Sequence, residues 1–216
     1  MATYEEDEEV EKFKRWWNEN WRSLAAGLVI GFGGIFGWQA YQHHEQGQAA
    51  QASQMYSDLK NFLQQHKLDE AGALGDRLAT EYAGTPYAVA AALKLAQQDV
   101  EQGKLDNAAK RLQWVIDNSK DAGLVPLAHL RLARVLWQQQ KPDDALKQLD
   151  GAQADKSDYA VLFDELRGDI TLAKGDRAGA RAAYEKAVQD GGAPANQPDK
   201  NDLQRKLDDL ADVVAK

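Results

Sequence analysis

Residues 93–108 read LKLAQQDVEQGKLDNA, and this stretch decides the fold of the chain. A small residue, Ala96, lies within one run of helix-forming residues, and a second, Ala108, lies twelve residues later near the start of the next run. The short polar turn at residues 103–106 separates the two runs. Because small residues let two helix backbones cross closely, the stretch predicts an antiparallel helix pair.

The same pattern recurs along the chain with spacings of 37, 37 and 35 residues. A single helix pair cannot bury its apolar face alone, so successive pairs must stack on one another. The sequence therefore predicts an all-α solenoid of about four helix pairs. The alanines that open the second helices are Ala71, Ala108, Ala145 and Ala180, and the positions twelve residues earlier hold Leu59, Ala96, Ala133 and Gly168.

The first copy of the repeat departs from the others. Leu59 occupies its small-residue place, and Gly75 stands four residues after Ala71, where the later copies have Leu112, Leu149 and Tyr184. The turn aspartates, among them Asp106, Asp143 and Asp176, are expected to cap the second helices. At the C-terminal end, a stripe of apolar residues at helical spacing predicts a capping helix. The stripe comprises Leu203, Leu207, Leu210 and Val214.

Outward from the repeats toward the N-terminus, residues 24–41 read LAAGLVIGFGGIFGWQAY and carry no charge. Eighteen helical residues extend roughly 27 Å, close to the thickness of a bilayer core. Tryptophans before the run, with Trp38 and Tyr41 at its end, are typical of the aromatic belts of a membrane span. The sequence therefore predicts a single transmembrane helix at residues 23–42.

The flanking cations predict the orientation of this span. Lys12, Lys14, Arg15 and Arg22 precede it, and the next cation is Lys60. By the positive-inside rule, the N-terminus lies in the cytoplasm and the repeats lie across the membrane. The predicted organisation is a cytoplasmic acidic and amphipathic tail at 1–22, the span at 23–42, a stalk at 43–54 and a repeat domain at 55–216. Within the tail, Val10, Phe13, Trp17 and Trp21 recur at helical spacing, as in an interfacial helix.

Glycines mark one face of the predicted span. Gly27, Gly31 and Gly34 share that face and Trp38 continues it, so another membrane helix could pack closely there. The alternative is that these glycines are merely tolerated in lipid, since glycine is common in membrane helices.

Composition excludes several classes of function. A formal net charge of −8, with no concentrated basic face, argues against nucleic-acid binding, and zero cysteines exclude disulfides and Cys-based zinc sites. No catalytic triad, phosphate-binding loop or metal-spaced cluster occurs. The sequence predicts a protein that is not an enzyme and has no catalytic residue, cofactor or metal.

The first helix of each pair in such a stack lines a concave groove that binds a peptide or a partner's helix. Trp137 is a candidate anchor there, and core packing between repeats is the alternative of equal weight. The predicted groove residues are Leu93, Gln97 and Val100, then Leu130, Arg134 and Trp137, then Glu165, Asp169 and Leu172.

The order of these parts resembles a known family. The acidic tail, the span ending GGIFGW and the repeats with LKLAQ, LRLARV and ELRGDITLAKGDRAGARAAYEKAV resemble the YfgM-type proteins over about residues 4–190. These are ancillary inner-membrane subunits of the bacterial Sec translocon with a periplasmic tetratricopeptide-like domain. The resemblance implies association with the translocon and with a membrane-anchored parvulin-type periplasmic chaperone, in support of newly secreted client proteins.

Two hypotheses of function follow. The first is a single-pass, type II bacterial inner-membrane protein whose periplasmic repeats bind partner or client proteins during secretion. The second is a membrane-anchored structural scaffold of an envelope or cell-division complex that binds no clients.

Overall fold

The computed structural model describes residues 2–152, 158–190 and 200–211, all as helices and their connections, with no strand in these ranges. The chain divides into two compact units, residues 1–50 and 51–216, and each is described by itself. The helices are α1 (Ala2–Gln64), α2 (Leu68–Glu81), α3 (Pro86–Glu101), α4 (Leu105–Asn118), α5 (Leu124–Gln138), α6 (Pro142–Gly151), α7 (Ala160–Ala173), α8 (Arg177–Asp190) and α9 (Lys200–Ala211).

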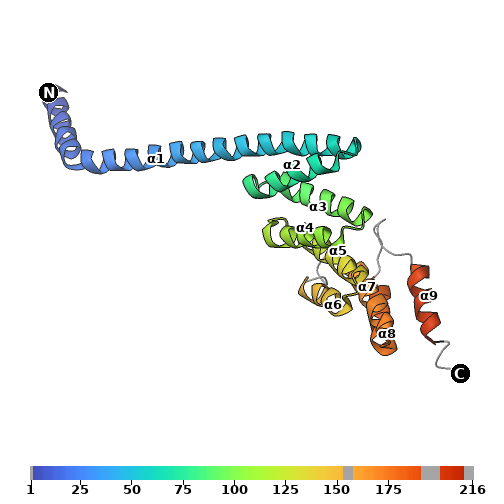
Figure 1. The fold of residues 1–216 in the computed structure, drawn as a ribbon. Coiled ribbons are helices and arrows are strands. Elements are labelled where there is room, and N and C mark those ends of the chain that lie inside the picture. Colours follow the sequence, from blue (N-terminus) through green and yellow to red (C-terminus); the bar gives the residue numbers. More distant parts are fainter. Residues whose placement is uncertain (1, 153–157, 191–199, 212–216) are drawn as a thin grey trace. The chain divides into compact units, whose positions relative to one another are not determined.

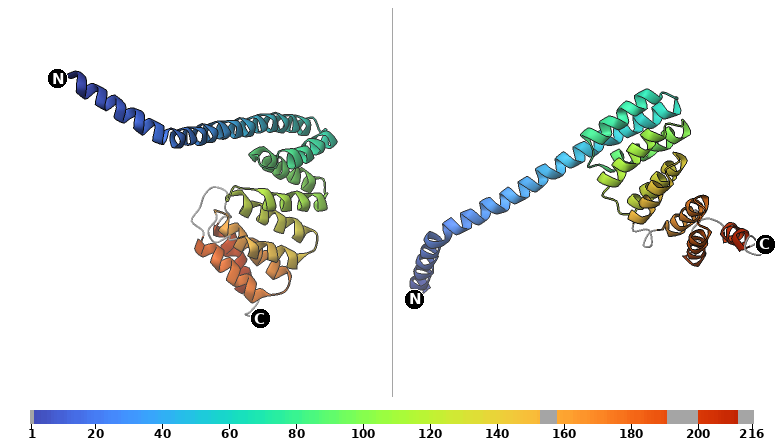
Figure 2. Two further views of the ribbon diagram at one scale, coloured as in Figure 1. Left: turned by 90° about the vertical axis from the view of Figure 1, so that its left-hand side faces the viewer. Right: turned by 60° about the horizontal axis from the view of Figure 1, so that its bottom comes forward.

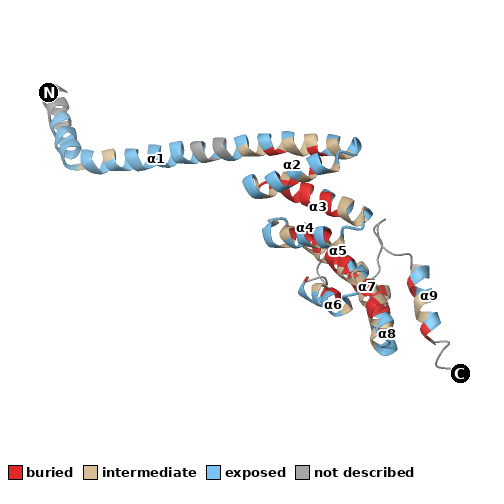
Figure 3. Ribbon diagram, in the orientation of Figure 1, coloured by how far each residue is buried: buried red, intermediate tan, exposed pale blue. Residues whose placement is uncertain are grey.

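Residues 51–216 form a stack of helix pairs (Figures 1 and 2). The end of α1 pairs with α2, and the pairs α3 with α4, α5 with α6 and α7 with α8 follow in chain order. Helix α9 packs on α8 and ends the stack. The predicted solenoid of about four helix pairs with a capping helix is confirmed, and Val214, the last residue of the predicted capping stripe, lies outside the described residues. Buried residues lie on the sides of the helices that face their neighbours (Figure 3).

The alanines that open the second helices are all fully buried, as the repeat predicts. Ala71, Ala108, Ala145 and Ala180 are each 0% exposed. Among their partners twelve residues earlier, Ala96 is 2% exposed. Close contact between the two helices of a pair therefore depends on the small residues at these crossings.

The last pair shows how tight such a crossing is. A Cβ atom added to Gly168 would lie only 2.3 Å from Cε1 of Tyr184. The Tyr184 ring is 1% exposed and fills the place where the second and third pairs have Leu112 and Leu149. A larger ring at this place is possible because the facing position is glycine rather than alanine.

In the first pair, the large residue lies in the first helix and the small residue lies in the second. Leu59 is fully buried in the first helix, and Gly75 faces it from the second. A Cβ on Gly75 would lie 3.6 Å from Leu59 Cδ1 and 2.0 Å from Cδ1 of Leu95 on α3. The missing side chain of Gly75 thus makes room for two leucines, one from its own pair and one from the next.

The turns inside the four pairs share one backbone geometry. His66, Gly103, Gln140 and Gly175 stand at equivalent places with φ of 57°, 73°, 61° and 87°. Around Gln140, its N–H donates to the Trp137 carbonyl and the Lys141 N–H donates to the Leu136 carbonyl, at 2.9 and 3.0 Å. This left-handed closure ends the first helix of each pair.

The capping role predicted for the turn aspartates is correct only for Asp176. Its Oδ1 accepts the Gly179 N–H at 2.9 Å. In the other turns a lysine holds the N-cap position without a side-chain cap, and Asp106 and Asp143 lie inside the first turn. There they favour the helix dipole, and they also reach the next repeat, where Asp106 accepts from Gln139 and Asp143 pairs with Lys174.

In residues 1–50, α1 carries large apolar side chains that are exposed, among them Phe36 at 64% and Ile30 at 76%. Among the described residues, no helix is sufficiently long and apolar to span a membrane. Within the predicted span at 23–42, the side chains of Leu24, Ala40 and Tyr41 lie outside the described residues.

Gly168→Ala is expected to lower the free energy of unfolding by about 1–3 kcal/mol, because the added methyl group clashes with the Tyr184 ring. Chemical denaturation of the purified chain measures this change. The double variant with Tyr184→Leu restores the alanine and leucine combination of the middle repeats and should recover part of the loss. As a control, Gly72→Ala adds a methyl group with no atom within 4 Å and should not destabilise. Equal losses for Gly168→Ala and Gly72→Ala would contradict this packing.

Gln140→Gly is expected to stabilise the chain by about 0.5–1 kcal/mol, because glycine adopts the left-handed backbone of this turn without strain. Thermal unfolding followed by circular dichroism measures the shift. Gln138→Gly, in the last turn of α5, is the matched control and should destabilise by about 0.5–1 kcal/mol. A loss of stability in both variants would show that the turn does not strain Gln140.

Candidate functional site

A pocket of about 350 Å³ opens between α3 and α5, the first helices of the second and third pairs. Its apolar part comes from three helices and comprises Ala96, Val100, Leu112 and Val135. Ala96 is also the small residue at the crossing of the second pair, so the pocket lies directly beside that crossing.

Polar side chains line the rest of this pocket. Arg131 and Arg134 project from α5 and are exposed, and neither forms an ion pair or hydrogen bond with another residue that the structure describes. Across from them, Gln97 Nε2 donates to Glu101 Oε1 at 2.9 Å. Two guanidinium groups beside an apolar floor can bind a polypeptide through its carboxylates or carbonyls while its apolar side chains enter the pocket.

Three of the predicted groove residues, Gln97, Val100 and Arg134, line the pocket. Leu130 does not, because it is 1% exposed and packs in the core with Phe163 and Leu166 of α7. Trp137 is partly buried against that same core. The packing alternative therefore describes Trp137 better than the role of a groove anchor.

Leu93 is also partly buried, against the apolar clusters shared by α3, α4 and α5. It occupies the same place in its repeat as Leu130. Leu93 and Leu130 thus contact the following repeat. The open surface begins at the next residue along the helix, as at Arg131.

The groove residues predicted on α7 face α9. Lys206 Nζ of α9 donates to Glu165 Oε1 at 2.9 Å and to Asp169 Oδ1 at 2.6 Å. Leu172 packs in the apolar cluster that contains Leu203 of α9. The capping helix therefore covers Asp169, whose equivalents in the second and third pairs, Gln97 and Arg134, are exposed.

The contact between α7 and α9 is a charged network around Tyr184. Its hydroxyl donates to Asp169 Oδ1 at 2.7 Å, and burial followed by this hydrogen bond raises the pKa of Tyr184. Burial opposes the charged form of Lys206, but its hydrogen bonds to Asp169 and Glu165 outweigh that cost and raise its pKa. The ammonium group also lies 5.4 Å from the centre of the Tyr184 ring. These contacts fix α9 in place.

The sequence prediction missed Glu101, Arg131 and Gln138, which also line the pocket. They follow or precede Gln97 and Arg134 by three or four residues, so they share the exposed stripe of each helix. Extending the prediction along that stripe, instead of toward the apolar positions, would have found them.

A second pocket, of about 360 Å³, lies on the second helices of the first two pairs. Arg111 of α4 lies at this pocket and links the repeats through Asp76 of α2, at 2.9 Å, and Asp99 of α3, at 3.0 Å. The Arg111 guanidinium group already binds two carboxylates, whereas Arg131 and Arg134 in the pocket between α3 and α5 bind none among the described residues.

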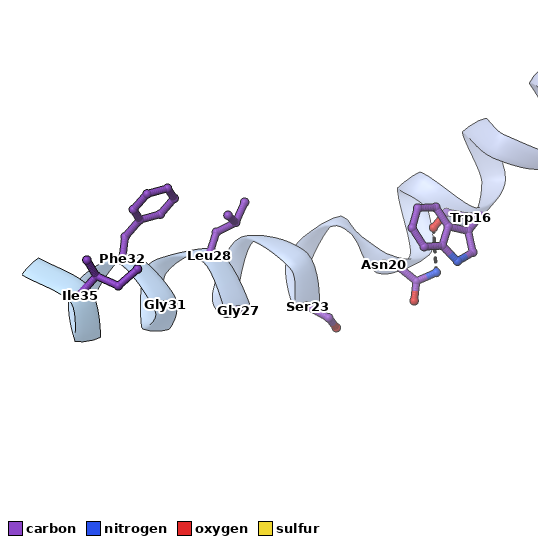
Figure 4. Close-up of a pocket in the computed structure, with 8 residues that line it drawn as sticks. All are labelled: Trp16, Asn20, Ser23, Gly27, Leu28, Gly31, Phe32 and Ile35. Carbon is purple, nitrogen blue, oxygen red and sulfur yellow. Dashed lines mark hydrogen bonds between the residues drawn. The ribbon is translucent and has the colours of Figure 1, made fainter.

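The glycine face predicted on the span is open along α1. A Cβ atom added to Gly27, Gly31 or Gly34 would meet no atom within 4 Å, and Trp38 is 64% exposed. Gly27 and Gly31 lie on α1 among Leu28, Phe32 and Ile35 (Figure 4).

Within the described ranges, no three His, Cys, Asp or Glu residues are grouped so that they could hold a metal ion.

Comparison with known proteins places the chain in a family. Residues 14–212 match a family model described as a tetratricopeptide repeat-like domain. A protein of Escherichia coli K12 named ancillary SecYEG translocon subunit is 37% identical over 196 residues, which cover 90% of this chain and 93% of that protein. This chain belongs to the YfgM-type family of tetratricopeptide repeat-like proteins.

A further relative extends this similarity over nearly the whole chain. A Neisseria gonorrhoeae protein with the same name is 30% identical over 210 residues, covering 97% of this chain and 99% of its own. Among solved structures, the MamA protein has a TM-score of 0.54 at 15% identity, covering 77% of this chain and 90% of its own. BtubC from P. vanneervenii has a TM-score of 0.54 at 14% identity, covering 79% and 84%. The solved structures support the fold alone.

One buried charge of this YfgM-type chain is poorly compensated. Asp164 of α7 is 4% exposed, and its Oδ2 makes no hydrogen bond within the described residues, although Lys186 Nζ lies 3.2 Å away. Burial raises the pKa of Asp164, and Lys186 offsets only part of this. The folded chain therefore holds the Asp164 proton more tightly than the unfolded chain does.

Because the folded pKa of Asp164 is raised, this carboxyl lowers stability as the pH rises through its unfolded and then its folded pKa. Asp164→Asn is therefore expected to raise the melting temperature at neutral pH, with a gain that disappears below a pH of about 3. Melting temperatures across this range measure the effect, and Asp117→Asn on the exposed side of α4 is the control. A gain that did not depend on pH would contradict this assignment.

Proposed function

We propose that the chain is a non-enzymatic ancillary subunit of the bacterial Sec translocon. The relatives' name supports the association, and the similarity covers nearly the full length of both chains. The pocket between α3 and α5, with two arginines that pair with no other described residue, is the observation that carries the binding role. In this proposal the groove holds partner or client proteins as they are secreted.

A single membrane anchor completes the proposal. The uncharged run at 24–41 and the exposed apolar side chains of α1 support it, and the cations before the run favour a cytoplasmic N-terminus. The proposed parts are the cytoplasmic tail at 1–22, the span at 23–42, the stalk at 43–54 and the periplasmic repeats at 55–216. Anchoring near the translocon raises the effective concentration of the groove beside emerging chains.

Two contacts of the anchored chain are proposed from the family resemblance and from the open glycine face. The periplasmic repeats bind a parvulin-type chaperone, and the face formed by Gly27, Gly31, Gly34 and Trp38 packs against a translocon helix. In this proposal, both contacts bring the groove close to secreted client proteins.

Client binding is tested with the detergent-solubilised full chain and a fluorescently labelled, unfolded segment of a secreted protein. Arg134→Glu is expected to weaken binding by about tenfold or more, because it replaces a cation in the pocket with a repelling charge. Fluorescence anisotropy measures the dissociation constant. Arg77→Glu on α2 makes the same charge change at an exposed site outside the pocket and should leave binding unchanged.

Equal weakening by Arg77→Glu and Arg134→Glu would show that net charge, and not the pocket, controls binding. If the wild-type chain has no affinity for unfolded segments, the scaffold hypothesis without client binding is the better description.

A further inference from the structure

The first part of α1 presents an exposed aromatic face. This face comprises Val10, Phe13, Trp16, Trp17 and Trp21, whose side chains are 45–62% exposed. At 100° per residue the five positions fall within less than half of the helix circumference. The rings also contact one another, with the Phe13 centroid 6.1 Å from that of Trp16 and 6.3 Å from that of Trp17.

Cations accompany this aromatic face. Lys12, Lys14, Arg15 and Arg22 lie in the same segment, which also holds Glu11 and Glu19 and therefore carries a net charge of +2 (4 − 2). The Arg22 guanidinium lies 5.9 Å from the centre of the Trp21 ring. Arg15 lies on the side of the helix opposite Phe13. Tryptophans with lysine and arginine beside and behind them match the chemistry of the lipid headgroup layer, where indole rings sit beside phosphate groups.

A bend in α1 separates this segment from the uncharged run that follows. The helix changes direction beside Trp16 and Asn20 (Figure 4). There the Asn20 side-chain amide donates to the Trp16 carbonyl at 2.8 Å. A polar side chain that bonds to the carbonyl four residues earlier competes with the helix ladder and favours a bend. The two parts of α1 can therefore take different directions in a membrane.

We propose that residues 10–22 form an interfacial helix that lies in the headgroup layer of a phospholipid bilayer, with its aromatic face toward the acyl chains. This inference rests on the proposed membrane anchor for its location. The bend at Asn20 turns the chain from the membrane plane into the span. The acidic residues 5–9 precede this helix and stay in water, because headgroup phosphates repel them.

The occupant of the aromatic face is a lipid surface rather than a partner helix, for two reasons. Helix pairing in water uses narrow stripes of aliphatic side chains, whereas four of the five residues here are aromatic. The face also leads directly into an uncharged run of membrane length, so its cations stand where lipid phosphates are available.

The absence of cysteine makes a direct test possible. Single-cysteine chains are made by Phe13→Cys, Arg15→Cys and Ile30→Cys, labelled with an environment-sensitive fluorophore and reconstituted at full length. The vesicles contain phosphatidylcholine and phosphatidylglycerol, with a quencher attached to the lipid acyl chains. Quenching is expected to be several-fold stronger at Phe13 than at Arg15, because these two side chains lie on opposite sides of the helix.

The Ile30 label separates this inference from the anchor. Strong quenching at Ile30 with equal, weak quenching at Phe13 and Arg15 would overturn the interfacial helix and leave the anchor intact. Quenching at Phe13 but not at Ile30 would support the interfacial helix and contradict the anchor. Equal, strong quenching at Phe13 and Arg15 would also overturn the inference, because the segment would then be surrounded by lipid.

Discussion

Close approach of the two helices in each pair is the constraint on which the rest of the solenoid depends. One of the two facing positions must be small whenever the other is large. The middle repeats satisfy this constraint by packing alanine against leucine, as in Ala96 with Leu112. The last repeat meets it with Gly168 against Tyr184, and the first reverses the roles with Leu59 against Gly75. What the four repeats share is thus one small and one large residue at each crossing, and not a fixed pair of residue types.

This constraint explains both what the sequence predicted and what it did not. The spacing of Ala71, Ala108, Ala145 and Ala180 sufficed to predict the helix pairs, because a buried small residue at a fixed period has few other causes. The groove was harder to predict, because it depends on how each pair is rotated against the next. Leu130 points into the following repeat, whereas Arg131, one residue later, reaches the open surface.

Contacts from distant parts of the chain were also beyond the sequence prediction. Lys206 covers Glu165 and Asp169 from α9, and no local pattern around α7 indicates that pairing. The capping helix was predicted from its own apolar stripe, but the surface that it covers was not. Because α9 covers the predicted groove residues of α7, the open part of the groove lies between α3 and α5, in the middle of the stack.

The proposed membrane attachment and the proposed partner binding use different chemistry in different units of the chain. Among the described side chains, residues 1–50 expose aromatic and aliphatic groups, whereas residues 51–216 bury apolar groups and expose arginines over one pocket. The most direct test of the central claim is co-isolation of SecYEG with the affinity-tagged full chain from membranes dissolved in a mild detergent. The account predicts that SecY is retained and that Gly27→Leu with Gly31→Leu reduces its amount. A wild-type chain that never retains SecY would contradict it.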